Sequence, residues 1–113
     1  MQRRNNMNFK THNDVNINVE GTHGQGQVTY KYSTLVAMFG EPLKEGFDDY
    51  KSDAEWHIFF DDCTRATIYN WKNGKNYCGE NGIPTEEIDC WNVGGVNGDA
   101  VKRIKEVFEA LTV

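Results

Sequence analysis

The sequence predicts a single α+β domain, a two-layer sandwich in which an antiparallel sheet carries two helices on one face. Its 113 residues are the length of one domain. Several short segments alternate apolar and polar residues with the period of a strand, and two others repeat apolar residues with the period of a helix. The expected order β-β-α-β-β-β-α is typical of α+β proteins and leaves the other face of the sheet partly open.

We expect a disordered extension over residues 1–12 and a single domain over residues 13–113. The sequence of the first half of this domain predicts two strands and a helix. Alternation in "DVNINVE" predicts a strand over residues 14–20. The glycines of "GTHGQGQ" predict a turn, with a bulged edge strand as the alternative, and "VTYKY" predicts a second strand. The helix is expected to have Ser33 as its N-cap and Gly40 just after its end.

The stretch "EWHIFFDDCTRATIYNW", residues 55–71, predicts a β-hairpin with the three-residue loop Asp61-Asp62-Cys63. This loop type places its third residue in the left-handed region, where glycine is usual and where Cys63 costs about 1 kcal/mol. A two-residue loop would instead divide the apolar side chains between both faces, so we prefer the longer loop. The resulting core face consists of Trp56, Ile58, Phe60, Ala66 and Ile68.

The last third of the chain predicts one strand and one helix. Residues 72–84 are rich in glycine and asparagine and predict a loop, after which "EEIDCWNV" predicts a short strand. The final helix is expected to have Asp99 as its N-cap. Its apolar stripe consists of Val101, Ile104, Val107, Phe108 and Leu111.

The composition indicates a soluble, cytoplasmic protein. The formal net charge is −5 and the pI about 5.1, which argues against direct nucleic-acid binding because phosphate would be repelled. The three cysteines contain no CxxC pair, so we predict reduced thiols and neither a metal nor another cofactor. The longest apolar run is far too short to cross a membrane. Homo-oligomerisation is left open.

The negative charge is concentrated between residues 41 and 62, and it defines one candidate surface. Two interpretations apply to it: a solvated acidic face, or a surface that meets a basic partner. The residues of this candidate acidic surface are Asp48, Asp49, Asp53, Asp61 and Asp62.

A second candidate site is a set of aromatic, amide and ammonium side chains in the glycine-rich regions. Such side chains can sandwich a nucleobase and hold a phosphate, or they can fasten a long loop to the sheet. The candidate ligand-binding residues are Thr22, His23, Gln25, Trp71, Lys72, Asn76, Tyr77 and Trp91. No catalytic residue is assigned. An enzyme acting on nucleotides is the alternative, with His23, His57 or Cys78 in the chemistry. The open sheet face with His57, Phe59, Arg65 and Tyr69 is the next place to look.

Four stretches in a fixed order resemble a family of small uncharacterised proteins encoded by tailed phages: "EGTHGQGQVTYKYSTLVAMFGEP", "DAEWHIFFDD", "ATIYNWKNGKNY" and "DCWNVGG". The family pattern reads GTxxQG, YxxLVxxFGxP, EWxIxFxDGTxATIYNxK and W-x-[IV]-G-G, and the resemblance covers roughly residues 15–110. The matching positions are Gly21, Thr22, Gln25, Gly26, Gly40, Pro42, Glu55, Trp56, Ala66, Thr67, Ile68, Tyr69, Trp91, Gly94 and Gly95. The chain departs from the pattern at Asp62-Cys63, where the family has Asp-Gly.

The resemblance implies a phage accessory gene, a class rich in small proteins that block host defences by binding, and it brings no assigned activity. The expected function is therefore a phage-encoded, non-enzymatic binding protein that inhibits a host system in the host cytoplasm. It would be anti-CRISPR-like or another anti-defence factor, and would act through its acidic surface on a host defence protein or by sequestering a nucleotide signal. A structural phage component is a further alternative.

Overall fold

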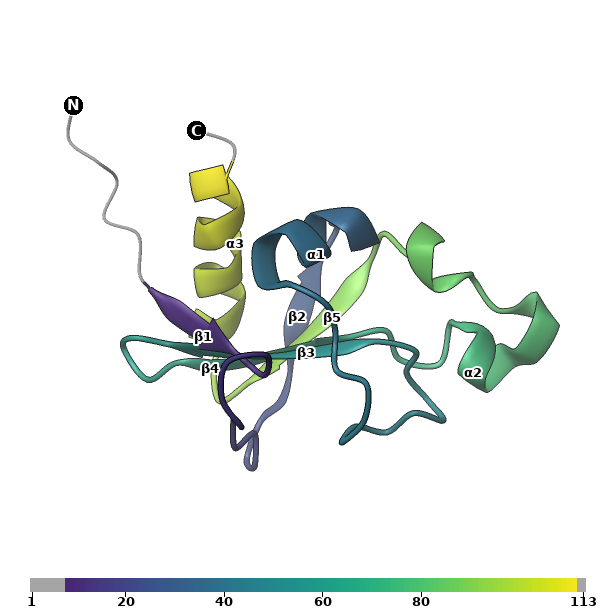
Figure 1. The fold of residues 1–113 in the computed structure, drawn as a ribbon, viewed down its shortest axis with the longest axis horizontal. Coiled ribbons are helices and arrows are strands. Elements are labelled where there is room, and N and C mark those ends of the chain that lie inside the picture. The colour runs from purple at the N-terminus through teal and green to yellow at the C-terminus, as the bar shows by residue number, and fades with distance from the viewer. Residues whose placement is uncertain (1–7, 112–113) are drawn as a thin grey trace.

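The computed structural model describes residues 8–111, which form one α+β domain with a five-stranded antiparallel sheet and three α-helices (Figure 1). The strand order across the sheet is β1-β3-β4-β5-β2. In chain order the elements are β1 (Phe9–Thr11), β2 (His23–Val28), α1 (Tyr32–Phe39), β3 (Glu55–Phe60), β4 (Arg65–Tyr69), α2 (Lys75–Cys78), the short 3₁₀ helices Gly79–Asn81 and Thr85–Glu87, β5 (Trp91–Gly95) and α3 (Asp99–Leu111). The α+β class and the antiparallel sheet are confirmed.

The central hairpin has the predicted register. Cys63 has a φ of 72°, in the left-handed region, and the Phe60 N–H donates to the Thr64 carbonyl at 2.9 Å across the three-residue loop. Ile58 pairs with Ala66 in the β3–β4 ladder. All five side chains predicted for the core face are fully buried, so the loop and the core face are both confirmed.

The hydrophobic core joins this hairpin to the two longer helices. Trp56 of β3 and Trp91 of β5 pack edge to face, with ring centroids 5.3 Å apart. The Trp56 indole N–H donates to the Gly40 carbonyl at 2.8 Å, which fastens the end of α1 to the sheet. The buried helical side chains in the same cluster are Leu35, Met38 and Phe39 of α1 and Ala100 and Ile104 of α3.

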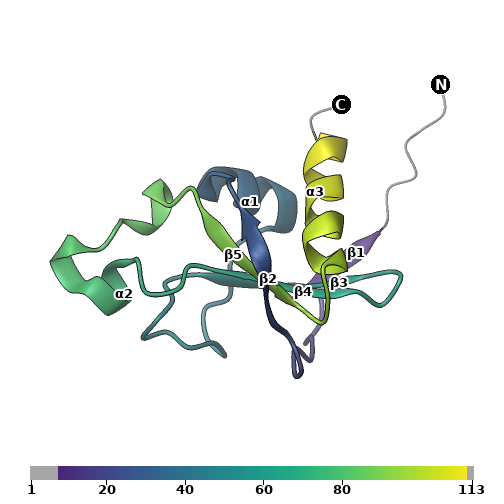
Figure 2. The ribbon, with the colours of Figure 1, turned by 180° about the vertical axis from the view of Figure 1, so that it is seen from behind.

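Two glycines allow α3 to approach the sheet closely. A Cβ on Gly95 of β5 would lie 2.5 Å from the Ala100 Cβ, and a Cβ on Gly26 of β2 would lie 3.3 Å from Val101. The side chains that would hold the helix away are therefore missing where it crosses these strands. α3 packs against β2, β4 and β5 and stands steeply against the sheet in both views (Figures 1 and 2).

The start of the domain differs from the prediction. Residues 1–7 of the expected extension lie outside the described residues, but Phe9–Thr11 form strand β1 beside β3. Residues 14–20 were predicted as a strand and form none. Arg65 explains why, because its Nη1 donates to the carbonyls of Asn18 and Glu20 at 2.7 and 3.0 Å, and these bonds replace a strand ladder. The segment still buries Ile17, which is 8% exposed.

The glycine-rich segment is a strand where a turn was predicted. His23–Val28 form β2, which pairs with β5 and has a register shift between Gly24 and Gly26. The bulged edge strand, the alternative interpretation, is therefore correct. Only the first residue of "VTYKY" belongs to a strand. Such a bulge also protects an exposed sheet edge from pairing with another chain.

The helix starts and the last strand are corrected as well. α1 begins at Tyr32 after Lys31, so Ser33 is inside the helix. Asp99 is the first residue of α3, and its N–H donates to the Asn97 carboxamide at 2.9 Å, so Asn97 provides the side-chain cap. The predicted strand "EEIDCWNV" is divided between a 3₁₀ helix and β5. No helix within residues 8–111 has the length and apolar character needed to cross a membrane.

The turn residue gives the first prediction. Replacing Cys63 by glycine removes a Cβ from a left-handed position and should raise the free energy of unfolding by roughly 1 kcal/mol. Urea denaturation followed by circular dichroism measures the change. Cys63→Ala is the matched control, since it keeps the Cβ and should give no gain. An equal gain in both variants would show that the thiol, and not the backbone angle, is the source of the strain.

Candidate functional site

The second face of the sheet carries the side chains that alternate with those of the core. Antiparallel pairing aligns them in rows across the strands. One row consists of Glu55, Tyr69 and Asn92, and the row beside it consists of His57, Thr67, Gly94 and Gly24. The second row therefore ends in two glycines on adjacent strands, and the Tyr69 side chain of the first row lies against both of them.

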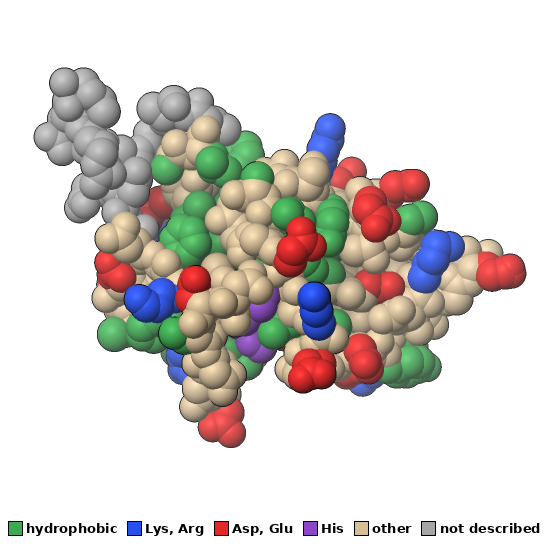
Figure 3. Space-filling model, viewed as in Figure 1, with side chains coloured by type: hydrophobic (Ala, Val, Ile, Leu, Met, Phe, Trp, Pro, Cys, Tyr) green, Lys and Arg blue, Asp and Glu red, His purple; other side chains and the backbone are tan. Residues whose placement is uncertain are grey.

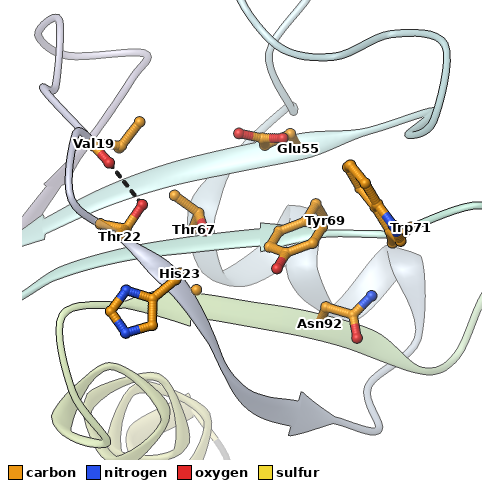
Figure 4. Close-up of a pocket in the computed structure, with 9 residues that line it drawn as sticks. Val19, Thr22, His23, Glu55, Thr67, Tyr69, Trp71 and Asn92 are labelled. Carbon is orange, nitrogen blue, oxygen red and sulfur yellow. Dashed lines mark hydrogen bonds between the residues drawn. The ribbon is translucent and has the colours of Figure 1, made fainter.

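A pocket of ≈ 370 Å³ lies on this face, with Gly94 in its lining (Figure 4). Its volume is near the lower end of small-molecule sites, which span roughly 300–1,000 Å³. The lining residues are Val19, Thr22, His23, Glu55, Thr67, Tyr69, Trp71, Asn92 and Gly94. A Cβ on Gly94 would collide with the Thr67 hydroxyl and would lie 3.5 Å from the Tyr69 ring. Glycine at this position leaves room for the Thr67 and Tyr69 side chains that line the pocket.

The chain before β2 forms one wall. The Thr22 hydroxyl donates to the Val19 carbonyl at 2.7 Å, which folds the segment over the sheet and leaves the hydroxyl oxygen free to accept (Figure 4). His23 Nδ1 is 3.3 Å from the Gly21 carbonyl, which can only accept, so the proton is on Nδ1. In the neutral ring, Nε2 is then an acceptor.

Tyr69 and Glu55 provide a hydroxyl and a carboxylate. Burial, and secondarily the charge of Glu55, raise the pKa of Tyr69 above its usual value of 10.0. The phenol is therefore protonated at neutral pH and is able to donate. Glu55 Oε2 is 2.6 Å from His57 Nε2, and this ring is almost completely buried. The contact holds the carboxylate in one orientation at the edge of the pocket.

Trp71 forms the aromatic wall and lies beside two lysines. Its ring is 43% exposed and packs edge to face with Tyr69, with centroids 6.0 Å apart. The Nζ atoms of Lys51 and Lys72 lie 5.1 and 5.9 Å from the centroid of the indole ring. Lys72 also lies over the ring of Tyr77, at 5.4 Å. The aromatic wall of the pocket thus has two ammonium groups over its ring.

Lys72 is held in an unusual backbone conformation. Its φ of 60° is in the left-handed region, and its N–H donates to the Lys51 carbonyl at 2.6 Å. A left-handed non-glycine residue needs surrounding contacts that fix it. The contacts come from a network of amide side chains just behind the pocket.

Asn70 is the centre of this network. It is fully buried, and its side-chain oxygen accepts the N–H groups of Asp53 and Ala54 at 2.8 and 3.1 Å. Its Nδ2 donates to Asp53 Oδ1 and to Asn73 Oδ1, both at 3.0 Å. Gly74 lies against the same groups, where a Cβ would collide with the Asp53 carboxylate. One buried amide therefore fixes both chain segments that carry the lysines.

The structure brings part of the predicted ligand set together. Thr22, His23 and Trp71 line the pocket, and Lys72 and Tyr77 lie beside it. Two amide residues have bracing contacts instead. Gln25 Nε2 donates to the Gly95 carbonyl at 3.0 Å, and Asn76 Nδ2 donates to the Asp49 carbonyl at 2.8 Å.

Trp91 is separated from the other predicted ligand-binding residues. It is fully buried in the core, where it contacts Trp56 and Tyr32. Trp91 and Asn92 are neighbours in β5, so their side chains point to opposite faces of the sheet. A ligand in the pocket meets Asn92 and does not reach Trp91.

Several residues of the pocket were missed by the sequence reasoning. They are Val19, Glu55, Thr67, Asn92 and Gly94, whereas Tyr69 was named as part of the open sheet face. The hairpin register that predicted the core face also assigns Glu55 and Thr67 to the other face, so two of the missed residues had a usable signal. No sequence signal placed Asn92 and Gly94 at the pocket, because the strands that neighbour β5 are known only from the sheet topology.

The predicted acidic surface is dispersed over several structural features. Asp48 accepts the N–H groups of Tyr50 and Lys51. Asp53 belongs to the Asn70 network, and Asp49 is exposed in the same loop. On the side of the molecule seen in Figure 3, acidic side chains are spread out and alternate with lysine and arginine.

The remaining two acidic residues lie at the tip of the hairpin. Asp61 is exposed, and Asp62 forms an ion pair with Arg103 Nε of α3 at 3.0 Å. Hydrogen bonds from Thr64, then from Arg103, lower the pKa of Asp62 below its usual value. Asp62 is thus engaged in fastening the hairpin to α3.

The cysteines occupy separate elements. Cys63 is in the hairpin loop, Cys78 ends α2, and Cys90 precedes β5. Cys78 Sγ is 3.3 Å from the Lys72 carbonyl, which it can bond as a donor. Within residues 8–111 no cluster of three histidine, cysteine or acidic side chains is arranged to bind a metal.

A second hollow of ≈ 740 Å³ lies on the same side as the pocket, next to His12, His57 and Leu43. Its described lining contains no tryptophan, tyrosine or phenylalanine.

The chain matches no protein-family model, and the search of curated proteins gives no match either.

Asn70 gives the second prediction. Asn70→Ala leaves two backbone N–H groups and Asp53 Oδ1 without their partner, which should lower the free energy of unfolding by about 2–4 kcal/mol. Chemical denaturation measures the loss. Asn73→Ala is the control. The Asn73 side chain accepts one hydrogen bond, from Asn70, so its removal should cost less free energy of unfolding. Equal losses in the two variants would contradict the central position of Asn70.

Proposed function

We propose that the chain is a non-enzymatic binding protein that captures a small nucleotide in the pocket over Gly94. The observation that carries the proposal is the exposed Trp71 wall with the Lys51 and Lys72 ammonium groups within 6 Å of its ring. Any nucleobase can stack on an aromatic ring, and ammonium groups near the ring can hold a phosphate. Glu55, the hydroxyls and Asn92 are the groups that would orient the base.

The position of the charges supports a base inside and phosphates outside. Glu55 is the acidic side chain in the lining, and within the described residues no lysine or arginine lines the pocket. A phosphate inside would be repelled by Glu55, whereas at the Trp71 rim it meets two cations. The proposal also takes α1 and α3 to cover the Trp56 face of the sheet, which leaves the opposite face for the ligand.

We further propose a biological setting from the resemblance to tailed-phage accessory proteins. Capture of a nucleotide signal would disable a host defence pathway without catalysis, as an anti-CRISPR-like or other anti-defence factor does. The protein would then act in the host cytoplasm. The acidic-surface route is less well supported, because the acidic residues do not form one patch and several are engaged in structural contacts.

Acid–base chemistry is a second candidate, favoured by the 2.6 Å contact between Glu55 and His57 at the edge of the pocket. A carboxylate held by a histidine is an arrangement that general bases use. Incubation of the protein with each nucleotide, followed by chromatography, separates the candidates. Unchanged nucleotide supports capture, and a product that disappears in Glu55→Gln supports the enzyme.

Stacking gives the third prediction. Calorimetric titration with the four ribonucleoside monophosphates should detect binding, and Trp71→Ala should weaken it by about 1–3 kcal/mol, the usual value for one stacked base. The side chain is exposed, so the fold should persist, which circular dichroism checks. Val96→Ala is the control, because Val96 is exposed outside the pocket and should leave affinity unchanged. An affinity that is unchanged in Trp71→Ala would refute the proposed site.

The lysines give the fourth prediction. A nucleoside monophosphate should bind more tightly than its nucleoside, and Lys51→Ala with Lys72→Ala should remove this difference. Each exposed charge contributes roughly 0.2–1 kcal/mol, and rising salt should screen the effect. Lys105→Ala on α3 is the charge-matched control. A phosphate preference that survives in the double variant would place the phosphate elsewhere.

A further inference from the structure

The groups that face the base allow its identity to be inferred, and this inference rests on the proposed function. Glu55, Tyr69 and Asn92 lie side by side on β3, β4 and β5, directly opposite one another in the ladder. Neighbouring strands are about 4.8 Å apart, so the backbones of Glu55 and Asn92 are separated by roughly 10 Å. Tyr69 is the residue between them in the row, so a base above Tyr69 would have Glu55 on one side and Asn92 on the other.

Glu55 is fixed as an acceptor. Its side chain is 17% exposed, and Oε2 is bonded to His57 Nε2 at 2.6 Å. A carboxylate can only accept, so His57 must carry its proton on Nε2. Within residues 8–111 no other group donates to this carboxylate, and no lysine or arginine pairs with it. A mostly buried carboxylate therefore keeps accepting capacity that a ligand can satisfy.

Asn92 is fixed as a donor. Its Oδ1 accepts from Gln27 Nε2 at 3.1 Å, which orients the amide group. Its Nδ2 is then available to the pocket. Tyr69 stands between them in the row, and its protonated hydroxyl reaches across β5 to within 3.8 Å of where a Gly24 Cβ would stand. The row thus presents an acceptor on one side and a donor on the other.

Guanine matches this arrangement. Its N1–H and N2 amino groups are adjacent donors that a carboxylate can accept together, and O6 and N7 are acceptors on its other edge. Adenine offers a single amino group beside the N1 and N7 lone pairs, which a carboxylate repels. We infer that the pocket selects guanine nucleotides, with Glu55 as the residue that determines specificity and Asn92 as the group that meets the acceptor edge.

The test compares GMP, IMP and AMP by calorimetric titration. IMP keeps N1–H and lacks the N2 amino group, so the expected affinity order is GMP, then IMP, then AMP. A matched base contact typically discriminates by about ten- to a hundredfold, and this is the expected advantage of GMP over AMP. Glu55→Gln should remove most of it, because the carboxamide has one acceptor and places a donor against the base.

Glu55→Gln keeps an oxygen that can accept from His57, so the fold should persist, and thermal denaturation checks this. Asp49→Asn is the control, since it removes an exposed negative charge from outside the pocket and should leave the preference for GMP intact. Equal affinity for the three nucleotides, still sensitive to Trp71→Ala, would overturn the guanine inference and leave the proposed function standing. Absence of binding by any of the three would overturn both.

Discussion

The register of the β3–β4 hairpin is the constraint on which the rest of the structure depends. Side chains in a strand alternate between faces, so a slip of one residue would move every side chain of the hairpin to the wrong side. The left-handed Cys63 fixes that register in three residues. It sends Trp56, Ile58 and their partners into the core and, by the same alternation, sends Glu55, Thr67 and Tyr69 to the pocket. Core and candidate site are two consequences of one turn.

Glycine has two different functions in this sheet, depending on the face to which the missing side chain would point. On the core face, Gly26 and Gly95 allow α3 to pack directly on the strands. On the second face, Gly24 and Gly94 leave room for the Tyr69 side chain, and Gly94 lines the pocket. Both pairs lie on the adjacent strands β2 and β5, so the same short segments position a helix and open a site. Glycine weakens a strand, and in β2 and β5 this loss of stability is compensated by packing against α3 and by the Gln25 contact with β5.

The part of the molecule beyond the sheet is held by polar contacts. Asn70, Asp53 and Asn73 exchange hydrogen bonds in a buried network, and the segment that follows closes on itself through Gly74 and Ile83. Such a network specifies one geometry because each partner must be satisfied. It can therefore hold Lys72 in a left-handed conformation and keep Trp71 exposed at the rim of the pocket.

The sequence by itself determined the α+β class, the hairpin with its loop and core face, and the positions of α1 and α3, because these follow from local periodicity and turn chemistry. It did not determine that residues 14–20 lie across the sheet without pairing, that "GTHGQGQ" pairs as β2, or that Phe9–Thr11 belong to the sheet. Those outcomes depend on which strands become neighbours and on long-range bonds such as Arg65 to Asn18. For the site, Thr22, His23 and Trp71 were predictable as residue types. Only tertiary structure decided that Trp91 is buried on the opposite face and that Asn92 and Gly94 complete the pocket, because strand order brings β5 beside β4.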